Sequence, residues 1–288
     1  MTERVVSFGE DNRLSGVLKG GAGETGLLLL NAGIVHRIGP HRLNVKLARR
    51  FDGPSLRFDL SGLGDSARAT AGVSHEAQAL KDVAAALDLL QDAGVDRVVL
   101  AGLCSGADDG YRAALTDARI RGLILLDPYA YGSPRARADR LIEKATDPAR
   151  WGRALARLTG GEKAEPAAAP DAAAEVVASM PTSQTPEEEA LALEGNDRVH
   201  PPRDEFGRNL QKLAQSGVDI YILYTNFVAE LLTKPSHFLD TFKTFDFGDR
   251  LTVDVNGESD HTYTTLASQE ALFAQIDTWM AARRGVSA

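Results

Sequence analysis

Strand-length apolar runs alternate with helical patterns along most of the chain, and this alternation constrains the fold more than any other feature. A run that is apolar throughout, such as residues 25–33, is typical of a parallel strand buried on both faces. Apolar residues spaced three and four apart predict amphipathic helices at 76–94 and 267–285. Further strands are expected at residues 4–9, 13–20, 55–60, 97–102, 122–127, 218–225 and 250–255, the first two as an antiparallel pair. The pattern predicts an α/β fold with a mostly parallel central sheet and helices on both faces.

Residues 129–205 interrupt this alternation, because no convincing strand occurs there. The stretches GGEKAEPAAAPDAAAE and PTSQTPEEE are typical of mobile linkers. We therefore expect a helical cap at 129–205, inserted in a core formed by residues 1–128 and 206–288. An insertion between two strands would lie over the carboxyl edge of the sheet, where open α/β folds bind ligands.

Composition limits the classes of partner. The formal net charge of −8 over 288 residues offers no attraction to nucleic acid or to an anionic membrane. The sequence contains no secretory signal and no apolar run near the roughly 20 residues of a membrane span. A single cysteine forms no internal disulfide, so we expect a cytoplasmic protein. Dispersed histidines, one cysteine and the lack of a G-x-G-x-x-G motif predict neither a metal site nor a nicotinamide cofactor.

The one cysteine, Cys104, lies at the centre of Gly102-Leu103-Cys104-Ser105-Gly106, directly after an apolar run. In a G-x-nucleophile-x-G turn the nucleophile takes a strained backbone conformation, and the two glycines let strand and helix pack closely. The glycines bracket Cys104 and not Ser105. The positive end of the following helix would favour the thiolate. We therefore predict that Cys104 is a nucleophile, the alternative being a buried, inert cysteine.

Three motifs give the chain its resemblance to a known family: LLLLNAGIVHRIGPHRLNVKLARRF, SLRFDLSGLGDS and GLCSGA. Together they resemble an α/β-hydrolase fold protein over nearly the whole length of the chain. Within that superfamily they are similar to the hydrolases associated with exosortase and exopolysaccharide gene clusters. Those proteins also resemble dienelactone hydrolases in placing cysteine at the nucleophile elbow. The resemblance implies a hydrolase, and little about its substrate.

A catalytic thiol needs a base that raises the thiolate fraction and later protonates the leaving group. His261 lies in TVDVNGESDHTYTT, between the last expected strand and the terminal helix. The hydrolase pattern presents its histidine in that loop and keeps the order nucleophile, acid, histidine. We therefore expect His261 to be the base.

The acid of a catalytic triad is harder to assign. The family template implies a carboxylate after the strand at 218–225, but no aspartate follows it within a few residues. Glu230 is our first choice. Asp127 is an alternative, because some family members carry the acid on the preceding strand, and Asn226 could orient the imidazole without charge.

An oxyanion hole would combine the backbone N–H of Ser105 with one from the loop at the end of the apolar run 25–33. The second donor would be Gly33 or Ile34. Four basic residues follow closely and could either recognise an anionic group or form a solvated face: His36, Arg37, His41 and Arg42.

These residues predict a cysteine-nucleophile hydrolase that acts on an ester, lactone or thioester through an acyl-Cys104 intermediate. The substrate would be a small-molecule or carrier-bound acyl compound, and a homodimer is compatible with the sequence. One alternative is an acyltransferase that uses the same acyl-cysteine. Another is a catalytically silent hydrolase fold that serves as a binding protein, which the missing aspartate after residue 225 favours.

Overall fold

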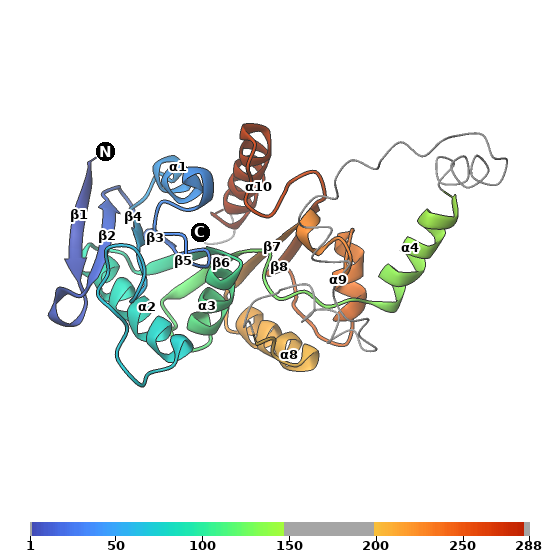
Figure 1. The fold of residues 1–288 in the computed structure, drawn as a ribbon, viewed down its shortest axis with the longest axis horizontal. Helices are drawn as coiled ribbons and strands as arrows, with labels where there is room; N and C mark the ends of the chain where they lie inside the picture. Colours follow the sequence, from blue (N-terminus) through green and yellow to red (C-terminus); the bar gives the residue numbers. More distant parts are fainter. Residues whose placement is uncertain (1, 147–198, 285–288) are drawn as a thin grey trace, which may run out of the picture.

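The computed structural model describes residues 2–146 and 199–284. These residues form an eight-stranded sheet with the strand order β1-β2-β4-β3-β5-β6-β7-β8 (Figure 1). The strands are β1 (Glu3–Phe8), β2 (Leu14–Lys19), β3 (Thr25–Leu29), β4 (Ser55–Phe58), β5 (Arg97–Leu103), β6 (Ile120–Leu126), β7 (Asp219–Thr225) and β8 (Leu251–Asn256). β1 pairs antiparallel with β2 and β2 antiparallel with β4, whereas the strands from β4 to β8 run parallel. The predicted α/β fold class and the opening antiparallel pair are confirmed.

Helices cover both faces of this sheet (Figure 1). The helices are α1 (Leu43–Arg50), α2 (His75–Asp92), α3 (Ser105–Ala114), α4 (Pro134–Thr146), α8 (Arg203–Gln215), α9 (Pro235–Thr241) and α10 (Leu266–Arg284). Single turns of 3₁₀ helix occur at Glu10–Asn12, Pro40–Arg42 and Asn226–Val228. Helices α1 and α10 pack on one face, and α2, α3 and α8 pack on the other.

Strand β3 shows why a continuously apolar run is needed at the centre of the sheet. Leu27 and Leu29 belong to the core beneath α1 and α10, whereas Leu28 and Leu30 belong to the core on the opposite face. Successive side chains of a strand point to opposite faces, so both sets must be apolar. The same alternation separates Leu123 and Leu125 of β6 from Ile124 and Leu126 of that strand.

Helix α2 shows how local sequence sets a helix boundary. Ser74 precedes the helix in an extended conformation, and its side chain accepts a hydrogen bond from the backbone N–H of Ala77 at 3.3 Å. This contact satisfies one of the N–H groups that have no partner in the first turn. Buried positions then recur three and four residues apart, at Ala79, Val83, Ala86, Leu87 and Leu90. The helix expected at 76–94 is therefore confirmed.

The expected cap falls largely outside the described residues. Within the predicted cap at 129–205, residues 147–198 are not described, and both predicted linker stretches fall among them. Of the rest, α4 is joined to the segment after β7 by ion pairs. Asp139 contacts Lys234 and His237, each at 3.1 Å, and Arg140 pairs with Glu230. The cap as a whole stays a prediction.

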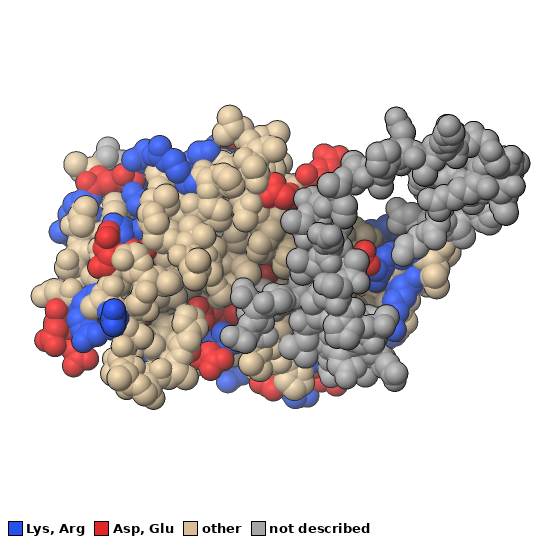
Figure 2. All heavy atoms as spheres, viewed as in Figure 1, with Lys and Arg blue, Asp and Glu red and all other residues tan. Residues whose placement is uncertain are grey.

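Acidic and basic side chains are interspersed over the face drawn in Figure 2. None of the described helices combines the length and apolar character needed to cross a bilayer.

Candidate active site

Cys104 stands on a sharp turn between β5 and α3. Its backbone angles are φ 57° and ψ −123°, a conformation that side-chain-bearing residues rarely adopt. The flanking glycines make the turn sterically feasible. A Cβ on Gly102 would lie 2.2 Å from the carbonyl oxygen of Gly106, and one on Gly106 would lie 2.1 Å from the carbonyl oxygen of Asn31. The half-buried thiol is thus held at the carboxyl edge of the sheet.

His261 reaches this turn from the loop between β8 and α10. Its Nδ1 lies 2.7 Å from Oδ2 of Asp127, and its ring is also hydrogen-bonded to Cys104. The ring of Phe227 stacks on the imidazole, with ring centroids 4.1 Å apart and an interplanar angle of 29°. The imidazole is therefore fixed between a thiol, a carboxylate and an aromatic face.

Asp127 directly follows β6 and is 1% exposed. Its carboxylate accepts two hydrogen bonds from Thr225, one from the backbone N–H at 2.7 Å and one from the hydroxyl at 2.6 Å. A carboxylate that accepts hydrogen bonds requires the Nδ1 of His261 to carry the proton between them. The other ring nitrogen of His261, Nε2, is then the one available to Cys104.

The surroundings of His261 change its affinity for a proton. Burial lowers its pKa, but the hydrogen bonds to Asp127 and Cys104, together with the charges of these two acidic groups, outweigh burial and raise the pKa to about 9. At neutral pH the imidazole is therefore protonated. A cationic imidazolium beside a thiol favours the thiolate.

The carboxylate beside His261 is not our first choice. Glu230 pairs with Arg140 and its side chain is 61% exposed, so the structure does not bring it to the imidazole. Asn226 is also exposed, and its backbone N–H donates to the carbonyl oxygen of Ser259 at 3.1 Å. Asp127, the alternative, occupies the position because the carboxyl ends of β6 and β7 are neighbours in the sheet.

The expected oxyanion residues lie on both sides of the turn. The backbone N–H of Gly33 donates to the hydroxyl oxygen of Ser105 at 2.9 Å, so the loop after β3 is tied to the first residue of α3. Gly33 has a φ of 53°, which glycine adopts at low cost. The side chain of Ile34 is 90% exposed. The first-turn N–H groups of α3, including that of Ser105, have no partner within the helix.

A buried carboxylate holds the loop that carries Gly33. Asp59 is fully buried and accepts hydrogen bonds from the side chain of Asn31 at 3.2 Å and from the backbone N–H of Arg37 at 2.6 Å. The guanidinium of Arg37 pairs with Asp59 and, at 2.6 Å, with Asp65. The charge of Arg37 is therefore already matched by two carboxylates and is poorly placed to recognise an anionic substrate.

Two residues of this site were not predicted from the sequence. Thr225 orients Asp127, and Phe227 packs on His261. A polar residue at the carboxyl end of an apolar strand was the available signal for Thr225, because strand ends of parallel sheets meet at one edge. Among residues 2–146 and 199–284, the structure contains no group of three or more His, Cys, Asp or Glu side chains placed to hold a metal ion.

A parallel sheet, a strained elbow at Cys104 and a histidine–carboxylate pair beside it are the defining parts of the α/β-hydrolase class of enzymes. The sequence model of the alpha/beta hydrolase family matches residues 27–284, and the chain belongs to that family. As a member of the family, the protein is a hydrolase.

Solved structures agree with the fold over nearly the full length. An esterase from Pyrococcus furiosus superposes with a TM-score of 0.55 at 14% identity, covering 97% of this chain and 89% of that one. Alpha/beta hydrolase domain-containing protein 10 from mouse gives a TM-score of 0.52 at 14% identity, covering 98% and 99% of the two chains. An alpha/beta hydrolase from Penicillium gives 0.53 at 18% identity, covering 97% and 98%. Comparison with curated protein sequences finds no match.

Proposed function

We propose that the protein hydrolyses an ester, lactone or thioester through an acyl intermediate on Cys104. The observation that carries this proposal is the chain of contacts from the elbow thiol to His261 and from His261 to the buried carboxylate of Asp127. A nucleophile, a base and a group that orients the base are the three parts that acyl transfer requires. The family membership and the esterase named among the structural neighbours agree with this class of reaction.

The reaction proceeds in two steps. In the first, the thiolate of Cys104 attacks the acyl carbonyl carbon, and the C–S bond forms while the carbonyl electrons move to oxygen. The tetrahedral intermediate collapses as His261 gives its Nε2 proton to the leaving alcohol or thiol. In the second, neutral His261 takes a proton from water, the hydroxyl adds to the thioester, and thiolate departs with release of the carboxylic acid. Asp127 keeps Nδ1 protonated throughout.

We propose that Ser105 supplies two hydrogen-bond donors to the oxyanion hole. Its backbone N–H, at the start of α3, is one donor. Its hydroxyl oxygen is already occupied by the N–H of Gly33, which leaves the hydroxyl hydrogen to be donated. In this arrangement Gly33 polarises the Ser105 hydroxyl instead of contacting the substrate itself, which differs from the direct role expected for Gly33 or Ile34.

We expect amides to be poorer substrates than oxygen or sulfur esters. A tetrahedral intermediate on cysteine expels thiolate more readily than it expels an unprotonated amine. Alcohol and thiol leaving groups need less help, and the single protonated imidazole of His261 suffices for them. The preferred substrates are therefore oxygen and sulfur esters, either free or attached to a carrier.

Intact-mass analysis tests this proposal. The protein is incubated with p-nitrophenyl butyrate and with a butyryl thioester, then quenched in acid. We expect a butyryl adduct on Cys104 that decays as butyrate is released, no adduct in Cys104→Ala, and strongly slowed acylation in His261→Ala. Decay that accelerates with added alcohol and yields the new ester would instead support an acyltransferase. A chain that neither gains an adduct nor turns over either substrate would contradict the acyl-cysteine mechanism and favour a silent binding protein.

A further inference from the structure

Phe227 covers a part of the proposed base that neither the nucleophile nor the acid contacts. It follows β7 by two residues, on the single 3₁₀ turn Asn226–Val228, and its ring stacks on the imidazole of His261. The two ring centroids are 4.1 Å apart and the ring planes are inclined by 29°. Asp127 and Cys104 hydrogen-bond to the edges of the imidazole, whereas Phe227 lies against its face.

The position of Phe227 is set by the same side chain that orients the acid. The hydroxyl oxygen of Thr225 accepts a hydrogen bond from the backbone N–H of Phe227 at 3.3 Å. The hydroxyl group of Thr225 also donates to Oδ2 of Asp127 at 2.6 Å, and this Oδ2 is the atom that contacts Nδ1 of His261. Four residues therefore form a closed ring of contacts, in the order Thr225, Asp127, His261 and Phe227.

A further contact joins the turn that carries Phe227 to the loop that carries His261. The backbone N–H of Asn226 donates to the carbonyl oxygen of Ser259 at 3.1 Å, and Ser259 is buried. On the other side of Phe227, the side chain of Val228 is buried in the core. The chain is therefore anchored on both sides of Phe227, so the aromatic ring and the imidazole belong to two elements that are fixed to each other.

The charge of His261 gives this stacked contact a direction. The π face of an aromatic ring carries partial negative charge, so it attracts a cation that lies within about 6 Å of the ring centre. The attraction is stronger where water is partly excluded. Phe227 is half-buried, and the side chain of His261 is 24% exposed. The ring of Phe227 therefore stabilises the protonated imidazole more than the neutral one.

The titratable groups near His261 act on the edges of its ring or are directed elsewhere. Burial lowers the pKa of His261, whereas Asp127, after β6, and Cys104, on the elbow, raise it to about 9. On the loop of His261 itself, the carboxylate of Asp260 accepts a hydrogen bond from the backbone N–H of Thr262 at 3.0 Å. The face of the imidazole that Phe227 covers thus receives its electrostatic contribution from an uncharged ring.

We infer that Phe227 is a positioning residue for the proposed base, and that its π face holds the imidazole of His261 in place and favours the imidazolium form. The inference rests on the proposed function, in which imidazolium gives its Nε2 proton to the leaving alcohol or thiol. Phe227 acts through His261 and takes no part in bond making or breaking. Thr225 aligns both partners of the imidazole, Asp127 at its edge and Phe227 at its face.

Titration of the full-length protein, labelled with ¹³C in its histidine rings and followed by nuclear magnetic resonance, tests this inference. The resonance of His261 is identified among those of the six histidines by its loss in His261→Gln. Phe227→Leu keeps an apolar side chain and removes the π face. We expect the titration midpoint of His261, near pH 9 in the wild type, to fall by about 0.5–1 pH unit in this variant. Phe227→Tyr retains an aromatic face and should stay within about 0.2 pH unit of the wild type.

Phe247→Leu is the matched control. Phe247 is also half-buried and stacks on a ring, that of Phe245, at a centroid distance of 6.4 Å. The same substitution there should leave the midpoint of His261 unchanged. The inference is overturned if Phe227→Leu titrates like the wild type, if Phe227→Tyr shows the same fall as Phe227→Leu, or if Phe247→Leu shifts the midpoint equally.

Hydrolysis of ethyl butyrate links the titration to the proposed function. Its alcohol leaving group needs a proton, so the alkaline limb of the pH profile should move to lower pH in Phe227→Leu by the same interval as the His261 midpoint. An alkaline limb that stays in place while the midpoint falls would contradict the link between Phe227 and catalysis. Failure of the wild type to form an acyl adduct on Cys104 would contradict the proposed function alone, whereas an unshifted midpoint would contradict the inference alone.

Discussion

At the scale of single residues, the position of one carboxylate decides how the site works. Asp127 is buried, accepts two hydrogen bonds from Thr225 and contacts His261, whereas Glu230 is exposed and paired with Arg140. Only the first arrangement can hold an imidazole in one tautomer. The proposed mechanism therefore assigns the orienting role to Asp127.

Replacing Asp127 by Asn tests this assignment. An amide can reverse the tautomer of His261 and removes the charge that stabilises imidazolium, so we expect acylation to slow by about a hundredfold or more. Glu230→Gln is the matched control, because it makes the same carboxylate-to-amide change. It should leave the acylation rate within about twofold of the wild type, because the ion pair with Arg140 that it breaks is on the surface. Stopped-flow release of p-nitrophenol measures both. Equal losses in the two variants would contradict the assignment.

Ser105→Ala tests whether the Gly33 N–H acts on the oxyanion through the Ser105 hydroxyl or is only shielded by that hydroxyl. If the Ser105 hydroxyl passes the hydrogen bond on to the oxyanion, its removal should lower the acylation rate by about a hundredfold while substrate affinity changes little. A rate that is unchanged or higher in Ser105→Ala would mean that the hydroxyl merely shields Gly33. The ratio of kcat to KM for a series of esters distinguishes these outcomes.

At the scale of secondary-structure elements, the site depends on how closely β5, α3 and the loop after β3 approach each other. Gly106 stands where the helix meets that loop, and a methyl group there would overlap the carbonyl oxygen of Asn31. Backbone atoms cannot move aside as a flexible side chain can. The geometry of the elbow therefore depends on β5, α3 and the loop after β3 together.

Gly106→Ala should therefore destabilise the fold by about 1–3 kcal/mol or more and misplace Cys104. Gly20→Ala is the matched control, because nothing lies within 4 Å of a Cβ added there. Urea denaturation gives the free energy of unfolding, and labelling of Cys104 by iodoacetamide reports its exposure. The expectation fails if both variants unfold at the same urea concentration.

Much of the architecture at this scale could be predicted from the sequence. Apolar runs marked the strands, helical spacing marked α2 and α10, and paired glycines marked the elbow around Cys104. The acid could not be chosen, because β6 and β7 end side by side and a carboxylate on either could reach the same imidazole. That adjacency is a fact of tertiary structure. The polar partner Thr225 and the stacked Phe227 depend on the same adjacency.

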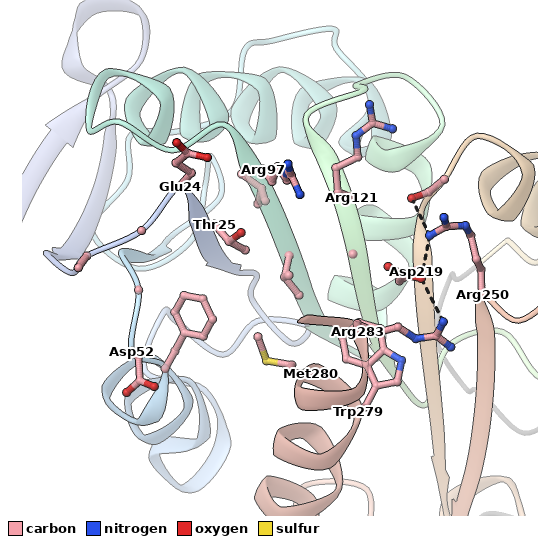
Figure 3. Close-up of a pocket in the computed structure, with 18 residues that line it drawn as sticks. Glu24, Thr25, Asp52, Arg97, Arg121, Asp219, Arg250, Trp279, Met280 and Arg283 are labelled. Carbon is pink, nitrogen blue, oxygen red and sulfur yellow. Dashed lines mark hydrogen bonds and ion pairs between the residues drawn. The ribbon is translucent and has the colours of Figure 1, made fainter. Parts of the chain in front are cut away.

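At the scale of the whole molecule, the sheet separates the candidate active site from a cavity at its opposite edge (Figure 3). Its carboxyl edge carries Cys104 and the charge network of His261, and its amino edge carries the cavity that contains Arg97. The two edges are joined by β5, which begins at Arg97 and ends beside Cys104.

Global stability should also depend on His261. Its pKa is about 9 in the folded protein and 6.5 in an unpaired state, so folding takes up protons in this range. The stabilisation is fully present below pH 6.5 and is lost as the pH rises through about 9. Urea denaturation at pH 6 and pH 10 should show a larger difference between wild type and His261→Gln at pH 6. A difference that grows at pH 10 would contradict this linkage.

The pH dependence of Cys104 alkylation tests most directly whether the elbow thiol and His261 act as one unit. Iodoacetamide reacts with thiolate, so the alkylation rate reports the thiolate fraction at each pH. If the imidazole of His261 activates the thiol, Cys104 should react rapidly at neutral pH in the wild type, and His261→Gln should react markedly more slowly at the same pH. Superimposable profiles for the two proteins would show that the sulfur does not sense the imidazole, and the mechanism proposed for this hydrolase would be wrong.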